Sequence, residues 1–364
     1  MKVLHAAETI KGGVETVIFH LTAPGSPSSS DHQYCYVFPR QQVTAGLHFS
    51  DSPYHFSRPR RGIYSCLTFA WNLIRAIWKE RPDIVHLHST FAGAIGRVVC
   101  LLMRPFRPSS VIYCPHAFAF LMEGNSRQKR AAVLVERTLA RITDKIVCVS
   151  KFEYREAINA GIPSGRLEVV YNGTPIENDY IPRKREPHSA IRLLYVGRFD
   201  YQKGIDILCE AVSRLPSSRF HLTVIGGNVR DSAVVPEFPP NTSILGWVDR
   251  RQLCTYYADC DILIMPSRWE GFAMTPLEGM ANGLPVVASD CTSLPELISH
   301  GYNGYIFPTG RSAELARILN TIDPAELPVL GERARQTVAE RFSIHGMIEN
   351  TNRVYRTAIQ AQNS

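Results

Sequence analysis

Residues 261–290 read DILIMPSRWEGFAMTPLEGMANGLPVVASD, and they contain the unit that repeats along the chain. The apolar segments 261–267 and 285–290 are short and hold β-branched residues, which favours buried strands. Between them, GFAMTPLEGMA favours a loop that turns into a helix. A strand, a helix and a second strand in this order predict a parallel pair joined by a right-handed crossover.

Such segments recur from one end of the sequence to the other. Runs of β-branched residues without strict alternation indicate strands that are buried on both faces of a sheet. Longer amphipathic segments between them, such as 63–80 and 204–215, predict helices. The expected fold class is α/β, with doubly wound Rossmann-like domains. The predicted strands are 1–7, 33–38, 83–89, 110–116, 145–150, 167–173, 191–197, 221–227, 242–248, 261–267, 285–290 and 303–308.

A polar stretch divides this pattern into two halves. Three prolines lie in residues 174–190, where the alternation stops before it restarts. We therefore predict two domains that face a cleft, 1–173 and 174–344. Ligands of such folds bind at the carboxyl ends of the strands, among loops and helix N-termini. The last segment, about 345–364, has an apolar face at helical spacing and predicts a final amphipathic helix.

The composition is that of a globular protein of 364 residues, with 45% hydrophobic and 20% charged residues. No apolar run reaches about 18 residues, so we expect no membrane-spanning helix. The first residues, MKVLHAAETIKGG, have too short an apolar part for a secretory signal peptide. Nine cysteines are scattered without metal-binding spacing, and we expect reduced core thiols in a cytoplasmic protein.

The net charge of +7 is unevenly distributed. Residues 1–172 carry 21 Lys and Arg against 12 Asp and Glu, a balance of +9, whereas 173–364 carry 19 against 21, a balance of −2. A basic N-terminal half predicts an acidic partner there: anionic lipid, phosphate or nucleic acid. No nucleic-acid-binding motif supports the last of these, so we expect no nucleic acid as a partner.

Two motifs in the N-terminal half favour a binding site. Gly12 and Gly13 follow the first predicted strand and open a helix, which lets backbone N–H groups approach an anion. The pattern is not GxGxxG, so no dinucleotide is indicated, and a plain tight turn is the alternative. His116 comes at the end of a predicted strand, where site residues gather; a core histidine bonded to the backbone is the alternative.

Metal binding is not expected. His86 and His88 share one face of a predicted strand, but their spacing reveals no third ligand. Asp259 and Asp261 resemble a metal-binding aspartate pair, but Asp261 begins a predicted strand, so we interpret them as capping or loop residues. We predict no metal and no other bound cofactor.

In the C-terminal half, Arg198 and Lys203 lie on a loop between a predicted strand and a predicted helix. An arginine offers a planar fork and a lysine a compact charge, and both suit a diphosphate. The alternative is an ordinary solvated loop.

Glu270 and Glu278 are the two glutamates of the opening stretch, separated by seven residues. We expect Glu270 in the loop and Glu278 in the helix, whose first N–H groups suit phosphate or hydroxyl oxygens. A carboxylate accepts hydrogen bonds from vicinal hydroxyls, so two spaced carboxylates suit a ribose and a hexose. Two ordinary acids at the start of a helix are the alternative.

This stretch resembles the signature of retaining glycosyltransferases, in which seven residues separate two glutamates. The chain resembles glycosyltransferase family 4, whose fold is GT-B, and is similar to bacterial surface-polysaccharide glycosyltransferases. The resemblance implies that the nucleotide-sugar binds mainly to the C-terminal domain and the acceptor to the N-terminal domain, to which the last helix crosses back. Supporting matches run in order along the chain: KGGVE at 11–15, PDIVHLHS at 82–89, PHAFAF at 115–120, TDKIVCVS at 143–150, VVYNGTP at 169–175, YVGRFDYQKGID at 195–206 and PELISHGYNGYIF at 295–307.

The resemblance also implies a role for each motif. Arg198 and Lys203 hold the diphosphate. Glu278 holds the nucleotide ribose and Glu270 the donor sugar. His116 contacts the transferred sugar near its reacting carbon. Donor contacts are further implied for Gly197, for the backbone of Phe272, Ala273, Met274 and Thr275, and for the backbone around Val248 beside the base, while Gly12 and Gly13 line the phosphate side and the acceptor entrance.

Ala273 and Met274 depart from the family pattern, in which glycine and a smaller aliphatic residue are common. The resemblance implies transfer with retention of anomeric configuration, by front-face attack through an oxocarbenium-like state. Fixed cations and helix N–H groups stabilise the leaving diphosphate without a metal. The alternatives are another GT-B enzyme, such as an epimerase or phosphorylase, and a non-catalytic sugar-nucleotide-binding assembly protein.

The segment 56–82 predicts contact with an anionic membrane. Its helix places apolar residues at spacings of three and four with basic residues nearby, which suits a peripheral protein with a polyprenyl-diphosphate-linked acceptor. The alternative is that this apolar face packs into its own domain. The apolar residues are Leu67, Trp71, Ile74 and Trp78, and the basic residues of the surrounding sequence are Arg58, Arg60, Arg61, Arg75, Lys79, Arg104, Arg107, Arg127, Lys129 and Arg130.

Overall fold

The computed structural model describes residues 1–23, 32–43, 47, 49, 52–58, 62–176, 190–228 and 237–363. Arg60, Arg61 and most of the predicted connecting stretch therefore lie outside the described residues. The chain divides into two compact units, Met1–Asn172 with Ile344–Ser364 (unit 1) and Gly173–Ser343 (unit 2). The limits expected from the sequence were 1–173, 174–344 and about 345–364.

Unit 1 is built on a parallel sheet of six strands in the order β2-β1-β3-β4-β5-β6. The central strands β3 and β4 are buried along their whole length, and the buried residues of β3 include His86 and His88. The order reverses between β1 and β3, which makes the loops after these strands the favoured place for a ligand. The strands are β1 (Lys2–Ala7), β2 (Gln33–Val37), β3 (Ile84–His88), β4 (Ser110–Cys114), β5 (Lys145–Cys148) and β6 (Leu167–Val169).

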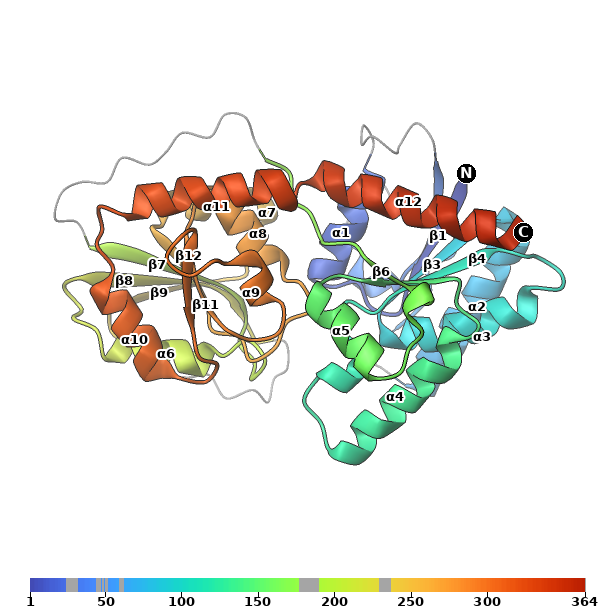
Figure 1. Ribbon diagram of the computed structural model, residues 1–364, viewed down its shortest axis with the longest axis horizontal. Coiled ribbons are helices and arrows are strands. Elements are labelled where there is room, and N and C mark those ends of the chain that lie inside the picture. The colour runs from blue at the N-terminus through green and yellow to red at the C-terminus, as the bar shows by residue number, and fades with distance from the viewer. Residues whose placement is uncertain are drawn as a thin grey trace. The chain divides into compact units, whose positions relative to one another are not determined.

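Helices cover this sheet, and the last helix of the chain is one of them. Helix α12 packs on β4 and α1 (Figure 1). Its Tyr355 hydroxyl lies 2.7 Å from Nδ1 of His86, and Ser110 Oγ donates to Gln362 Oε1 at 2.9 Å. The helices are α1 (Gly13–Thr22), α2 (Ile63–Glu80), α3 (Thr90–Met103), α4 (Ser126–Ala140), α5 (Lys151–Asn159) and α12 (Ile344–Asn363), with short 3-10 turns at Arg40–Gln42, Ala119–Leu121 and Ser164–Arg166.

Unit 2 holds a second six-stranded parallel sheet, in the order β12-β11-β10-β7-β8-β9. Here the order reverses between β7 and β10, whose carboxyl ends are neighbours. Its strands are β7 (Ile191–Arg198), β8 (Phe220–Gly227), β9 (Thr242–Gly246), β10 (Ile262–Met265), β11 (Val286–Ser289) and β12 (Gly304–Phe307), and its helices are α6 (Ile205–Ser213), α7 (Arg250–Asp259), α8 (Met274–Ala281), α9 (Leu294–Leu297), α10 (Ser312–Thr321) and α11 (Leu327–Arg341).

The predicted α/β class with two doubly wound sheets is confirmed. All of the predicted strands are present in the described residues, and each observed strand lies within two residues of its predicted limits at the start. Each unit has its own buried apolar core between sheet and helices. Among the described residues, no helix is both long and apolar enough to cross a membrane.

Candidate functional site

Lys203 and Glu270 meet at the point where the strand order of unit 2 reverses. Lys203 follows β7, Glu270 follows β10, and the lysine Nζ lies 2.6 Å from Glu270 Oε1. Gly204 makes this approach possible: it has a φ of +65°, and a Cβ there would lie 2.1 Å from the carbonyl oxygen of Pro266. Any other residue would push the two loops apart. The glycine therefore sets the distance between the two charges.

Polar groups bind both the side chain and the backbone of Glu270. Its side chain is 6% exposed, and the same Oε1 accepts a hydrogen bond from Ser267 Oγ at 2.7 Å. Its backbone N–H donates to Thr292 Oγ1 at 2.9 Å, and that hydroxyl donates back to the Glu270 carbonyl at 2.8 Å. Thr292 comes from the loop after the neighbouring strand β11. Residues from three adjacent strand ends thus hold Glu270: Lys203 and Ser267 contact its carboxylate, and Thr292 contacts its backbone.

The loops that carry Lys203 and Glu270 are joined by further hydrogen bonds. The Arg268 N–H donates to the Gln202 carbonyl at 2.7 Å, and Gln202 Nε2 donates to the Trp269 carbonyl at 3.1 Å. Arg198, the last residue of β7, donates through Nη2 to Gln202 Oε1 at 2.9 Å and pairs with a second acid, Asp200, at 3.2 Å. Its side chain is 42% exposed and so is accessible to an anion.

Glu278 lies on α8, one turn beyond the start of the helix. Its Oε2 accepts a hydrogen bond from the buried Tyr257 hydroxyl at 3.2 Å. Ala273 is the N-cap of this helix and supplies no side-chain cap, so the first N–H groups of α8 keep their capacity to bind an anion.

The other predicted donor residues are spread over three strand ends of unit 2. Phe272 and Met274 are buried, and Thr275 is half-buried in the first turn of α8. Gly197 lies near the end of β7, where a Cβ would approach the Tyr195 hydroxyl to 3.2 Å. Val248 follows β9, which is the edge strand and lies two strands from β7.

In unit 1, His116 follows β4 in a strained turn. Its φ is +54° and that of Ala117 is +131°, values that non-glycine residues rarely adopt. Ser89, at the end of the neighbouring strand β3, also has a positive φ of +72°. Such conformations cluster where function requires a particular side-chain direction.

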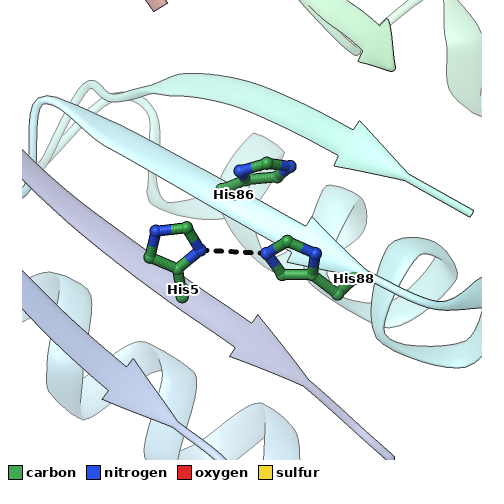
Figure 2. A group of neighbouring side chains, drawn as sticks. All are labelled: His5, His86 and His88. Carbon is green, nitrogen blue, oxygen red and sulfur yellow. Dashed lines mark hydrogen bonds between the residues drawn. The ribbon is translucent and has the colours of Figure 1, made fainter. Parts of the chain in front are cut away.

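His116 is the last of a series of imidazoles that the sequence did not predict as a group. His88 Nδ1 lies 3.0 Å from His116 Nε2, and His88 Nε2 lies 2.9 Å from His5 Nδ1 (Figure 2). His5 lies opposite His86 in the register of β1 and β3, which brings a third imidazole beside the pair on β3. Register between distant strands is not visible in a single sequence, so His5 was missed.

Burial favours the neutral form of three of these histidines, His86, His88 and His116. Burial lowers the pKa of His86 and His88 well below 6.5, and the neighbouring histidines lower it further. Burial also lowers the pKa of His116 to about 4. Glu153 behaves in the opposite sense: burial raises its pKa to about 7, although the backbone N–H of Val149 opposes the shift.

His5, His86 and His88 also form the one group in the described part of the chain that combines three potential metal ligands. One nitrogen from each lies within 4.8 Å of the others, and all three rings are buried. A neutral imidazole is a good metal ligand. The existing hydrogen bonds already use ring nitrogens of this group, however, including both nitrogens of His88.

The predicted glycine loop lies at the start of α1. Gly12 is the N-cap with a φ of +95°, and Gly13 is the first helical residue. Both are exposed, and the turn is closed by the Glu15 N–H, which donates to the Ile10 carbonyl at 2.8 Å. The positive φ explains the need for glycine at position 12.

Two Rossmann-like units, with charged side chains gathered at a strand-order reversal, define a two-domain α/β class of protein in which ligands bind at the carboxyl ends of the strands. Residues 6–178 match the profile described as Glycosyltransferase Family 4, and residues 190–322 match the profile described as Glycosyl transferases group 1. The chain belongs to glycosyltransferase family 4 and has the GT-B fold.

Individual relatives agree with this assignment. The chain is 32% identical to an uncharacterised 41.2 kDa protein in the cps region of Klebsiella pneumoniae, over 98% of this chain and 100% of that protein. It is 30% identical to the O-antigen biosynthesis glycosyltransferase WbnH of Escherichia coli, over 62% of this chain and 64% of that protein. HepE of Anabaena, solved in complex with UDP-glucose, covers the whole of both chains with a TM-score of 0.77 and 19% identity, which supports the fold.

The buried titratable groups predict how the stability of unit 1 depends on pH. Between about pH 4.5 and 6.5 the unfolded chain protonates His86, His88 and His116, whereas the fold keeps them neutral. Glu153 opposes this, because in the same window it is protonated in the fold and ionised when unfolded. Near the middle of this window the unfolded chain binds more protons overall, because three histidines outweigh one glutamate, so the free energy of unfolding should rise with pH.

Hydrogen exchange of the β1, β3 and β4 amides, corrected for intrinsic exchange at each pH, measures this slope. His116→Asn should lower it, and Glu153→Gln should raise it, each by about 1.4 kcal/mol per pH unit. A profile that is flat between pH 4.5 and 6.5 would show that the histidines are not held neutral.

Proposed function

We propose that this glycosyltransferase moves a sugar from a nucleotide-sugar to a saccharide or lipid-linked acceptor, with retention of anomeric configuration. The ion pair of Lys203 and Glu270 at the strand-order reversal of unit 2 carries the proposal. A diphosphate that binds to Lys203 takes the place of the Glu270 carboxylate as the partner of the ammonium group. Glu270 is then released to accept hydrogen bonds from sugar hydroxyls.

The chemistry follows from where negative charge develops. Departure of the nucleoside diphosphate builds charge on its oxygens, and Lys203, Arg198 and the first N–H groups of α8 are suited to stabilise it. The acceptor attacks on the same face of the sugar through an oxocarbenium-like state, with His116 beside the reacting carbon. Glu278 holds the ribose through its remaining acceptor positions.

Donor and acceptor are proposed from the relatives. HepE binds UDP-glucose, which supports a UDP-hexose as donor. WbnH acts in O-antigen biosynthesis and the Klebsiella relative is encoded in a cps region, which supports a bacterial surface polysaccharide as product. We propose a polyprenyl-diphosphate-linked glycan on the cytoplasmic face of the membrane as the acceptor, because it suits the synthesis of an O-antigen as well as that of a capsule.

A direct assay tests this function. Thermal-shift screening of nucleotide-sugars identifies the donor, and release of nucleoside diphosphate with lipid-linked acceptors measures transfer. Anomeric proton couplings of the product distinguish retention from inversion. An epimerised donor or phosphate-dependent cleavage would favour the epimerase or phosphorylase, and tight donor binding without any turnover would favour a non-catalytic assembly protein.

Removing either cation should weaken nucleotide binding. We expect Lys203→Ala and Arg198→Ala each to raise the Kd for UDP about 10- to 100-fold, because each removes a charge-assisted hydrogen bond of ~1.5–3 kcal/mol. Isothermal titration calorimetry measures this, with Arg317→Ala, an exposed cation on α10 that pairs with Glu314, as the control.

Lys203→Ala also leaves Glu270 without its cation, so the double variant Lys203→Ala, Glu270→Ala separates lost binding from lost stability. Unchanged affinity in both single variants would exclude these residues from the diphosphate site.

The surface of α2 supports peripheral membrane binding. Leu67, Trp71 and Trp78 are 64%, 62% and 50% exposed, so the alternative in which this face packs into its own domain is wrong for these residues. Ile74 differs, because it is half-buried against the core. The buried face of the helix is a second apolar stripe: Phe69, Leu73, Ala76 and Ile77.

Basic side chains surround these exposed aromatic residues. Arg75 and Lys79 are exposed on the same helix, and the guanidinium of Arg107 lies 4.4 Å from the ring centroid of Trp78. Arg58 does not belong to this surface, because its Nε pairs with the buried Glu8 at 2.6 Å. Aromatic rings with cations around them suit the interface of an anionic bilayer.

We expect the protein to co-sediment with vesicles that contain anionic lipid at low salt, and to be released at high salt. Each basic residue near the surface contributes about 1 kcal/mol, so several hold the protein reversibly. Trp71→Ser with Trp78→Ser should weaken binding, whereas Leu134→Ser, an equally exposed apolar residue on α4, should not. Failure to co-sediment at low salt would favour a soluble acceptor.

Turnover should not require a metal ion. We expect the rate to be unchanged after EDTA treatment, because fixed cations and helix N–H groups are proposed to stabilise the leaving diphosphate. Release of nucleoside diphosphate, measured before and after the chelator is removed, tests this. Activity that is lost in EDTA and restored by Mg²⁺ or Mn²⁺ would contradict it.

A further inference from the structure

Three imidazoles of unit 1 form a hydrogen-bonded series that ends at His116. His5 on β1 contacts His88 on β3 at 2.9 Å, and His88 contacts His116 after β4 at 3.0 Å. Adjacent rings are nearly parallel, with interplanar angles of 18° and 21°. Figure 2 shows the first of these contacts, with the rings of His5 and His88 end to end on neighbouring strands.

The protons of this series are coupled. A neutral imidazole has one N–H and one lone pair, and both nitrogens of His88 are engaged. If His88 donates from Nδ1, then His116 accepts at Nε2 and carries its own proton on Nδ1. If His88 donates from Nε2 to His5, then His116 donates from Nε2 and presents a lone pair at Nδ1. No other arrangement of neutral rings satisfies both contacts.

We propose that His88 is a positioning residue that fixes which ring nitrogen of His116 carries the proton, with His5 setting the state of His88 from the far side. The proposal rests on the proposed function, in which His116 lies beside the reacting carbon of the donor sugar. A fixed tautomer makes Nδ1 of His116 either a donor or an acceptor toward that sugar, and not a mixture of the two.

The surroundings of His88 suit this task. It is the last residue of β3, a central strand between β1 and β4, and its side chain has no exposure to solvent. His116, by contrast, stands in a strained turn outside the regular strand. A rigid strand residue therefore holds the ring of a residue whose backbone alone would not fix its orientation.

A metal at His5, His86 and His88 is the competing interpretation. The 2.9 Å contact between His5 Nδ1 and His88 Nε2 needs a proton between the two nitrogens, whereas a metal bound through these same nitrogens needs both lone pairs. The two interpretations exclude each other at this contact. The tests below therefore include bound metal as an outcome.

The first test reads the tautomer directly. In protein labelled with ¹⁵N-histidine, two-bond proton–nitrogen correlation spectra distinguish a protonated from an unprotonated ring nitrogen, and His116→Asn identifies the His116 signals. We expect one tautomer in the wild type. His88→Phe and His5→Phe should each convert His116 to a mixture, although His5 does not touch it. His5→Asn should have a smaller effect than His5→Phe, because its amide occupies the position of Nδ1 and keeps a hydrogen bond to His88 Nε2.

His86→Asn is the matched control. His86 lies on the same strand and face as His88, is equally buried, and has its ring centroid 4.1 Å from that of His88. Its Nδ1 contacts the Tyr355 hydroxyl and not the series. The His116 signals should be unchanged in this variant.

The second test measures transfer. His88→Phe should lower kcat about 10- to 100-fold with little change in KM for the donor, because misorientation of a reacting group acts on the chemical step. His88→Asn should recover part of this loss, since its amide still reaches His116. In a His116→Asn background, His88→Phe should have little further effect, because the two residues act as one unit.

Two results would overturn the proposal. One is an unchanged His116 tautomer in both His5→Phe and His88→Phe, whether or not the protein transfers sugar. The other is stoichiometric zinc in the dialysed wild-type protein that is lost in His86→Asn. A tautomer that responds as expected in a protein without transfer activity would support the coupled series and refute the proposed function. If His88→Phe does not fold, the tautomer of His116 is measured in His5→Phe and His5→Asn instead.

Discussion

Close backbone contact at Gly204 is the constraint on which the charged site of unit 2 depends. A Cβ at this position would lie 2.1 Å from the Pro266 carbonyl oxygen, so only glycine allows the loop after β7 to lie against the end of β10. The ammonium of Lys203 and the carboxylate of Glu270 come from these two loops and meet at 2.6 Å. Their backbones are held together independently of the charges, by the Arg268 N–H on the Gln202 carbonyl. The ion pair is therefore a consequence of the packing, and the backbone contact between the two loops does not depend on it.

The two sheets differ in strand order, but both gather candidate residues at strand ends. In unit 1 His88 ends β3 and His116 follows β4, and in unit 2 Lys203 and Glu270 follow β7 and β10, where the order reverses. In unit 2 the residues are charged and partly open, as the 42% exposure of Arg198 shows. In unit 1 they are buried imidazoles whose pKa is lowered, so they are neutral. A charged site suits a diphosphate, and a neutral hydrogen-bonding site suits sugar hydroxyls.

The strands, the helices and the division into two sheets were predictable because they depend on the spacing of apolar residues over short stretches of sequence. The features that the sequence could not reveal depend on the register between strands and on which face of a helix is buried. His5 joins His86 and His88 only through the alignment of β1 with β3, residues 81 and 83 positions apart. On α2 two apolar stripes compete, and spacing alone does not say that Leu67 and Trp71 face solvent while Phe69 and Leu73 face the core. The acids and cations of unit 2 were found from motif spacing, whereas their supporting hydroxyls, Ser267 and Thr292, follow from contacts between loops.

Positive φ at strand ends is adopted both by glycine and by other residues. In unit 2 it is adopted by Gly204 and Gly226, where a Cβ would collide with the backbone, and by Thr292 after β11, whose φ is +43°. At the ends of β3 and β4 in unit 1, positive φ is adopted by Ser89, His116 and Ala117, at a cost of roughly 1–3 kcal/mol for each residue. Glycine would remove that strain at His116 but would also remove the imidazole that contacts His88. The side chain is thus present despite the strain, and in the proposed arrangement the series of imidazoles behind it gives the His116 ring a defined direction and a defined proton.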